Sequence, residues 1–142
     1  MDADEVDALV AGQYGGRTLA PGWPTADTGA GLGFATTGGS VFLVIDDDGR
    51  VAGECGTKRP VDAAGTVEIG YGLAAGSRGH GLGTAAVTAL VDWLRTKPEV
   101  RVVTAEVHVD NTPSRRVVER LGFRIYDGPV DGYVYYRLDL RH

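Results

Sequence analysis

The chain has 142 residues, 43% of them hydrophobic, and its 14 basic and 19 acidic side chains give a net charge of −5. No apolar run approaches the roughly 20 residues that cross a bilayer, and the single cysteine, Cys55, excludes an intrachain disulfide and a cysteine-cluster metal site. The acidic balance argues against a nucleic-acid surface, and the acidic start is unlike a secretory or transit signal. We therefore expect one cytoplasmic domain over residues 1–142, with no nucleic-acid partner, no membrane partner and no metal.

The first 40 residues contain few regular elements. A short helix is predicted over residues 2–11, where the apolar residues share one side. Residues 12–40 are rich in glycine and predict a loop with one weak helical turn after Thr25. Because long loops in compact domains usually bind something, Trp23 and Phe34 either line a binding pocket or close the end of the core.

A hairpin and a third strand follow. Strands are predicted over residues 41–45 and 50–55, on either side of an Asp-Asp-Asp-Gly turn. This turn is not an EF-hand, because the twelfth position counted from Asp46 is Thr57 rather than glutamate. Alternating apolar residues predict a strand over residues 67–73, which completes an antiparallel meander.

The second half of the chain predicts two helices between strands. Apolar residues recurring at every fourth position predict a helix that begins near Leu82 and ends before Pro98. The second helix has Thr112 as its N-cap and Pro113 at its first position, and a left-handed Gly122 ends it. The remaining strands are predicted at residues 101–109, 124–127 and 133–140, with Gly128-Pro129 between the last two.

The glycine-dense turn between residues 73 and 84 predicts an anion site. Backbone N–H groups and the positive end of the helix dipole there suit a phosphate group. A P-loop would place a lysine after its last glycine, but Gly83 is followed by Thr84. The glycine spacing also differs from the dinucleotide fingerprint. Four nearby arginines suit an anionic cofactor, namely Arg78, Arg115, Arg116 and Arg120.

The spacing Arg-x-x-Gly-x-Gly at Arg78, Gly81 and Gly83 resembles the acetyl-CoA motif of the GNAT superfamily of N-acetyltransferases. The resemblance covers roughly residues 41–140 and is similar to the branch that acetylates ribosomal-protein N-termini. The segments that carry this likeness are Glu68-Ile69-Gly70-Tyr71, Asn111-x-x-Ser114 and Leu121-Gly122-Phe123.

The resemblance implies an α+β fold in which helices flank a mixed, mostly antiparallel sheet. In this family the central sheet splays, here between the strand ending at Leu73 and the strand ending near Val109. Residues 1–40 would form the acceptor side, and residues 41–140 the acetyl-CoA-binding core.

The resemblance also implies where acetyl-CoA binds. Main-chain groups of Tyr71 and Leu73 would pair with the amides of the pantetheine arm, as an added strand does, and Asn111 would contact the cofactor at the mouth of the splay. The turn residues that would hold the pyrophosphate are Arg78, Gly79, His80, Gly81, Gly83 and Thr84.

The implied activity is transfer of an acetyl group to a primary amine by direct attack. Glu68 would be the general base, and Ser114 would hydrogen-bond the leaving thiolate. The alternatives are a plain strand glutamate or one that pairs with an arginine, and a serine that caps a backbone N–H. Val118 stands where many members carry a tyrosine donor, and the possible substitutes are Tyr133, Tyr135 and Tyr136.

The acceptor is either a protein N-terminus or a small amine. The alternative function is a non-catalytic acyl-CoA-binding sensor or interaction module. Family members usually begin with a strand, whereas this chain begins with a helix-like segment. Either the sheet lacks that strand or a partner chain completes it, and a homodimer is one such arrangement.

Overall fold

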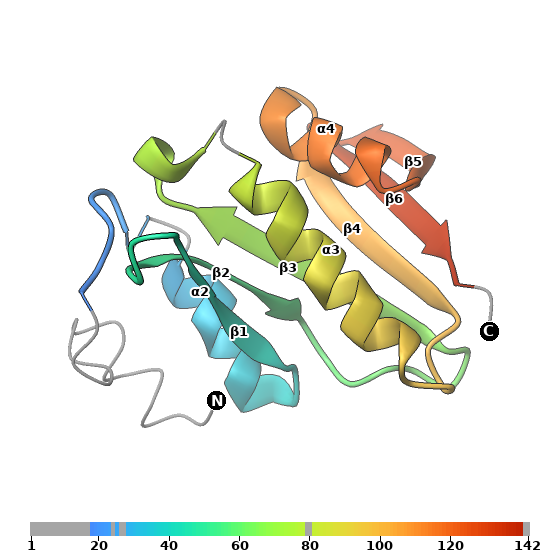
Figure 1. The fold of residues 1–142 in the computed structure, drawn as a ribbon. Coiled ribbons are helices and arrows are strands. Elements are labelled where there is room, and N and C mark those ends of the chain that lie inside the picture. The colour runs from blue at the N-terminus through green and yellow to red at the C-terminus, as the bar shows by residue number, and fades with distance from the viewer. Residues whose placement is uncertain (1–17, 24, 26–27, 79–80, 141–142) are drawn as a thin grey trace.

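One mixed β-sheet organises the protein (Figure 1). The computed structural model describes residues 18–23, 25, 28–78 and 81–140. In this part of the chain six strands lie in the order β1-β2-β3-β4-β6-β5, and every neighbouring pair is antiparallel except β3 and β4. The predicted meander and mixed sheet are therefore confirmed. The strands are β1 (Val41–Ile45), β2 (Val51–Thr57), β3 (Thr66–Leu73), β4 (Val102–His108), β5 (Arg124–Val130) and β6 (Tyr133–Asp139).

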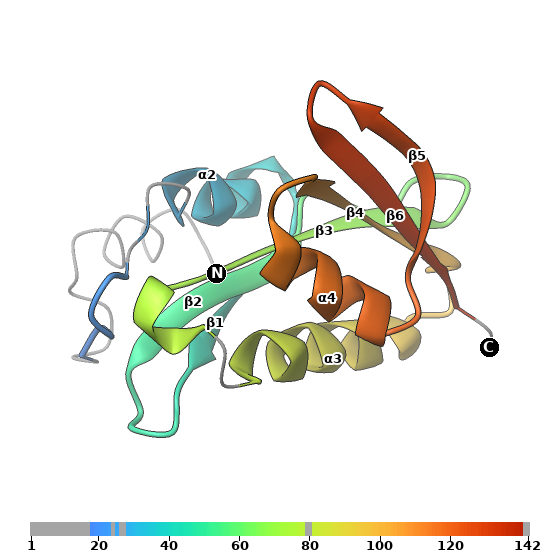
Figure 2. The same ribbon diagram turned by 90° about the horizontal axis from the view of Figure 1, so that it is seen from above.

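Helices cover both faces of this sheet, as Figure 2 shows. On one face lies α2 (Thr28–Gly33), which continues into the 3-10 helix η2 (Phe34–Thr37). On the other face lie α3 (Leu82–Arg95) and α4 (Thr112–Arg120), and a 3-10 turn, η3 (Ala75–Ser77), precedes α3. The α+β class and both predicted helices of the second half are confirmed.

The segment from Thr28 to Thr37 is more helical than its composition suggests. A single helical turn is predicted there, but α2 and η2 follow one another directly. Three of the six residues of α2 are glycine, a poor helix former. Burial stabilises the helix instead, because Thr28 and Leu32 are fully buried. The helix predicted over residues 2–11 lies outside the described residues.

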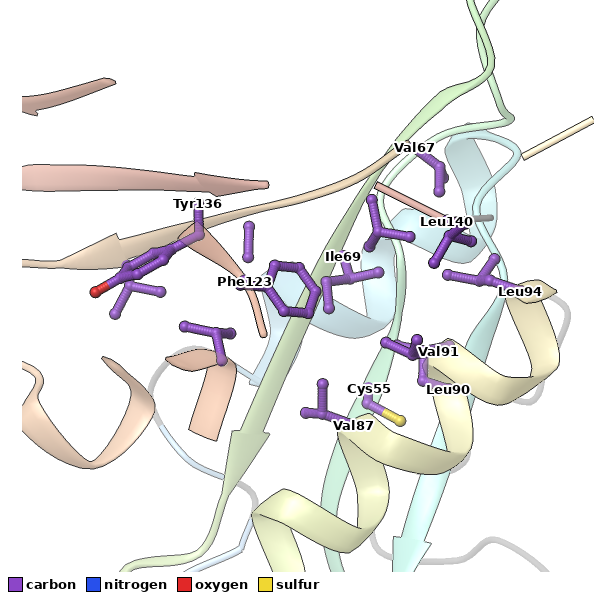
Figure 3. Close-up of a cluster of buried hydrophobic side chains, with 14 of the residues drawn as sticks. Cys55, Val67, Ile69, Val87, Leu90, Val91, Leu94, Phe123, Tyr136 and Leu140 are labelled. Carbon is purple, nitrogen blue, oxygen red and sulfur yellow. The ribbon is translucent and has the colours of Figure 1, made fainter. Parts of the chain in front are cut away.

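The main hydrophobic core lies between the sheet and α3 (Figure 3). Cys55 from β2 and Ile69 from β3 belong to it. Fully burying one valine, leucine or isoleucine side chain stabilises the fold by about 1.5–3 kcal/mol. The core therefore fixes α3 against the sheet, with Gly83 of its first turn beside Leu73 at the end of β3. The predicted stripe supplies the helix side of the core, with Val87, Leu90, Val91 and Leu94 buried and Leu82 and Ala86 at its edge.

β3 and β4 separate before either strand ends. Their parallel pairing stops where Ile69 lies opposite Ala105, whereas β3 continues to Leu73 and β4 to His108. The unpaired ends form a fork whose strands lead toward α3 and α4. The predicted splay is confirmed.

Asn111, rather than the predicted Thr112, caps α4. Its side-chain oxygen accepts a hydrogen bond from the N–H of Ser114 at 3.2 Å, and Thr112 is already the first residue of the helix. An asparagine oxygen satisfies the first-turn amides at least as well as a threonine oxygen does. The predicted end of the helix is confirmed, because Gly122 has a φ of +94°.

The turn predicted at Gly128-Pro129 is wrong, since β5 continues through both residues. β5 is an edge strand, and an edge tolerates proline because one row of its N–H groups needs no partner. The chain instead reverses at Asp131-Gly132, where φ is 51° and 83°. β1 forms the other edge of the described sheet. That a second copy completes the sheet stays a prediction.

Candidate functional site

A cavity of about 980 Å³ occupies the fork between β3 and β4. Its lining comes from both faces of the sheet. Gly83 and Ser114 belong to the helices of the face that we call the α3–α4 side, and Gly31 and Phe34 belong to the face that we call the α2 side. A volume of this order is typical of small-molecule sites. The cavity therefore passes through the sheet and joins the two sides.

The first turn of α3 forms one wall of the α3–α4 side. Gly81 is the N-cap, with a left-handed φ of +80° that glycine adopts without strain. Within the described part of the chain, no side chain caps this helix, so its first amides are available to a ligand and its positive dipole end favours an anion. Gly81, Gly83 and Thr84 line it, as predicted for an anion site. Gly79 and His80, predicted for the same turn, lie outside the described residues.

Arginine side chains add positive charge to this side. Arg115 of the predicted cluster is engaged elsewhere, because its Nε donates to the Tyr136 hydroxyl at 3.0 Å and its Nη1 donates to the Val109 carbonyl at 3.1 Å. The three arginines of the cluster that line the cavity are Arg78, Arg116 and Arg120.

Tyr71 and Leu73 line the cavity on the β3 side of the fork. The Tyr71 hydroxyl donates to the Ser114 carbonyl at 2.9 Å, which ties β3 to α4. Burial raises the pKa of Tyr71 to about 12, so this hydroxyl stays protonated at neutral pH. Ser114 lines the cavity as well. The structure thus brings together Tyr71, Leu73 and Ser114, which sequence reasoning assigned to one site.

Asn111 lines the cavity too, and its side chain is the N-cap of α4. Asn111→Ala is expected to lower the free energy of unfolding by about 1 kcal/mol, because α4 loses its cap. Asn111→Asp should keep the wild-type stability, since a carboxylate caps equally well. Urea denaturation measures both variants. Equal destabilisation of the two would show that the cap bond does not hold α4 in place.

The α2 side contains a buried carboxylate that sequence reasoning did not single out. Glu54 on β2 is 5% exposed and lines the cavity. Its Oε2 accepts a hydrogen bond from Trp23 Nε1 at 2.7 Å. Trp23 belongs to a second core cluster and so closes the end of the core, whereas Phe34 lines the cavity. The signal for Glu54 was a lone charge in the otherwise small and apolar strand Val-Ala-Gly-Glu-Cys-Gly-Thr.

Glu68, the predicted base, is ion-paired. Lys58 Nζ donates to Glu68 Oε2 at 2.7 Å, and the side chains are 23% and 34% exposed, respectively. Lys58 lines the cavity, so Glu68 is connected to the cavity wall through this lysine. Glu68 therefore forms an ion pair, as one of the alternatives predicted, but its partner is a lysine rather than the expected arginine.

The tyrosines of the last strand have different surroundings. Tyr133 lines the cavity, and its ring packs edge-on against His108 with the centroids 5.3 Å apart. Tyr136 is buried, and its hydroxyl donates to Glu119 Oε2 at 2.9 Å. Tyr135 packs against Tyr126. Tyr133 is therefore the member of this set that lies at the site.

Metal clusters and membrane-spanning helices are absent from the described part of the chain. Within residues 18–140, apart from those the structure does not describe, no three His, Cys, Asp or Glu side chains gather to hold a metal ion. The same described part has no helix long and apolar enough to cross a membrane. Asp46 of the hairpin acts locally, because its Oδ1 accepts from the N–H groups of Asp48 and Arg50.

Comparison with known proteins gives a consistent result. A family model described as "Acetyltransferase (GNAT) domain" matches residues 2–124. The chain is 30% identical to "Uncharacterized N-acetyltransferase p20" of Bacillus licheniformis over 82 residues, which cover 58% of this chain and 46% of that protein. The chain spans about half the length of the curated relatives it matches, 46% and 50%.

Solved structures share the fold. The GNAT domain of S. lividans PAT has a TM-score of 0.70 and 16% identity, with 99% of this chain and 88% of that chain covered. Mycobacterium smegmatis RimJ in complex with CoA-disulfide has a TM-score of 0.63 and 23% identity, with 96% of this chain and 76% of that chain covered.

Proposed function

Because this chain belongs to the acetyltransferase (GNAT) family, we propose that it transfers the acetyl group of acetyl-CoA to a primary amine. The observation that carries the proposal is the cavity in the fork, which joins the glycine turn on the α3–α4 side to the buried Glu54 on the α2 side. A donor and an acceptor can therefore approach each other from opposite faces of the sheet.

The α3–α4 side fits the CoA portion of the donor. The first turn of α3 would hold the pyrophosphate, and Arg78, Arg116 and Arg120 would neutralise phosphate charge. The space beside Gly81 is open to a ligand, because a Cβ built on this residue would meet nothing within 4 Å. Main-chain groups of Tyr71 and Leu73 would pair with the pantetheine amides, and Asn111 would contact the arm at the mouth.

Direct attack is the favoured reaction course. The amine nitrogen bonds to the thioester carbonyl carbon, the carbon–sulfur bond breaks, and a base takes the proton that the nitrogen loses. A covalent acetyl-cysteine is disfavoured, because burial and then the charge of Glu54 raise the pKa of Cys55 to about 11. The nucleophilic thiolate is therefore scarce at neutral pH. Ser114 would hydrogen-bond the departing sulfur.

Glu68 is the base that the family resemblance proposes, and its ion pair makes the proposal testable. A base role for Glu68 predicts that Glu68→Gln lowers kcat about tenfold or more, because the amine loses help with its proton. The affinity for acetyl-CoA should stay nearly unchanged. Ser114→Ala should also lower kcat, by about tenfold, since one hydrogen bond to the sulfur is lost.

Lys58→Met is the matched control for Glu68→Gln. It breaks the same ion pair but leaves the carboxylate in place, so a base role for Glu68 predicts that most of the turnover remains. Steady-state kinetics measure kcat, and calorimetry measures acetyl-CoA affinity. Equal losses in the Glu68 and Lys58 variants would assign Glu68 to the ion pair alone, and full activity of Ser114→Ala would exclude the serine from the leaving step.

The function itself is tested by acetyl-CoA turnover over a panel of amines. N-terminal peptides come first, because the Glu68–Tyr71 and Asn111–Ser114 segments resemble the ribosomal-protein branch; polyamines and amino-acid derivatives follow. Release of free CoA thiol that depends on an added amine is the expected result. Acetyl-CoA binding without thiol release on any amine would instead support a non-catalytic acyl-CoA-binding module.

A further inference from the structure

Glu54 lies where the fork meets the α2 side. On β2 it is paired with Gly72 of β3, beyond the last paired residues of β3 and β4. A Cβ built on Gly72 would lie 3.0 Å from Glu54 Oε1, and one on Gly31 of α2 would lie 3.5 Å from the same oxygen. The carboxylate therefore sits over the free end of β3, with α2 on its other side.

This position is costly for a charged group. A buried carboxylate is tolerated only where partners compensate for the water it has lost. The indole N–H of Trp23 provides one strong hydrogen bond to Oε2, and this bond fixes the carboxylate in one orientation. The rest of β2 is small or apolar and fully buried. Glu54 is therefore a buried, oriented carboxylate in the lining of the cavity, which is the kind of polar group that fixes a ligand in such a site.

We propose that Glu54 receives the acceptor: its carboxylate pairs with the incoming ammonium group and takes one proton from it, which leaves the neutral amine that attacks the thioester carbon. This inference rests on the proposed acetyl transfer. Gly72 lies between Tyr71 and Leu73, the residues proposed to hold the pantetheine arm, so Glu54 stands beside the end of that arm. The neutral nitrogen then bonds to the thioester carbon, the carbon–sulfur bond breaks, and the second proton that the nitrogen loses goes to the departing thiolate.

On this proposal Glu54 takes the place of Glu68 as the base, and Glu68 acts only through its ion pair with Lys58. The Lys58 side chain crosses the same face of β3, since its Cε lies 3.4 Å from a Cβ built on Gly70. Lys58 therefore stands between Glu54, opposite Gly72, and Glu68, which it binds at 2.7 Å. The glycines at positions 70 and 72 leave room for Lys58 and Glu54, the side chains that form this wall of the α2 side.

The proposal specifies the chemical class of the acceptor. It is a primary amine that arrives protonated, because an ammonium group complements a buried carboxylate and a neutral nitrogen does not. At pH 7 about a tenth of an α-amine is neutral, and under about a thousandth of a lysine amine. The contribution of Glu54 should therefore grow with the basicity of the acceptor.

Glu54→Gln tests this assignment, since glutamine keeps the volume and can still accept the Trp23 hydrogen bond. The first probe is the amine identified by the panel above. The second is its hydrazide analogue, whose attacking nitrogen is already neutral at pH 7. Glu54→Gln is expected to lower kcat/KM about 100-fold or more for the amine and less than about tenfold for the hydrazide. Acetyl-CoA affinity should not change.

Two further variants complete the experiment. Asp92→Asn removes a carboxylate from the exposed face of α3 and should leave both rates unchanged. Glu54→Asp retains the charge and should recover part of the amine rate. Equal losses of Glu54→Gln for both probes would mean a structural role, and a loss below about threefold would exclude Glu54 from the reaction; either overturns the inference while the acetyl transfer stands. Absence of turnover in the wild-type protein would instead overturn the proposed function.

Discussion

Gly81→Asp is expected to abolish measurable acetyl-CoA binding while the protein remains folded. The new carboxylate would enter the first turn of α3, where the pyrophosphate is proposed to bind, and would oppose its charge across a short distance. A Cβ at Gly81 meets nothing within 4 Å, so the loss would not come from a steric clash. Isothermal titration calorimetry should show affinity reduced by about 100-fold or more.

Gly49→Asp is the matched control for this substitution. Gly49 in the hairpin between β1 and β2 also has a positive φ, +77°, and open space for a Cβ. Both variants therefore bear the same strain of a left-handed non-glycine residue, about 1 kcal/mol or more. Gly49→Asp should bind acetyl-CoA like the wild-type protein. Similar affinity losses in both variants, or wild-type affinity in Gly81→Asp, would exclude the first turn of α3 as the pyrophosphate site.

Gly56→Ala is expected to destabilise the fold severely, by about 3 kcal/mol or more. The new methyl group would overlap the carbonyl oxygen of Ser40, the residue before β1, and neither backbone segment can move away without breaking the β1–β2 pairing. Gly70 lies directly opposite on β3, but a Cβ there meets the flexible Cε of Lys58 at 3.4 Å.

Gly70→Ala therefore provides the comparison and should cost less than about 1 kcal/mol. Thermal and urea unfolding of the two variants measure the difference. Similar stabilities would mean that the two backbones at Ser40 and Gly56 can separate freely, against the close approach in the structure.

The sequence predicted most of the elements because their signals were strong and local. The period of α3 identified its buried stripe, and Gly122 marked the end of α4. The last hairpin was misplaced because Gly128-Pro129 was taken as the turn, although Asp131-Gly132 carries the stronger hairpin signal. Proline is compatible with β5 only because β5 is an edge, and strand order cannot be read from local sequence.

The candidate site was predicted in part for a similar reason. The turn before α3 and the segment after β4 have recognisable spacings, and the structure brings Gly81 and Ser114 to one cavity. Glu54 carried no such spacing. Its position depends on the register that sets it opposite Gly72 and on the burial of Trp23. Both are tertiary features, so the sequence directed attention to Glu68 instead.

The brief pairing of β3 with β4 has a mechanical consequence. Three strands lie on each side of it, and in the described residues backbone hydrogen bonds join the two halves only between residues 65–69 and residues 101–105. A ligand bound in the fork would contact both halves of the sheet at once and would hold them together. Binding would then raise the free energy of unfolding, by about 2.7 kcal/mol at a ligand concentration of 100 times Kd.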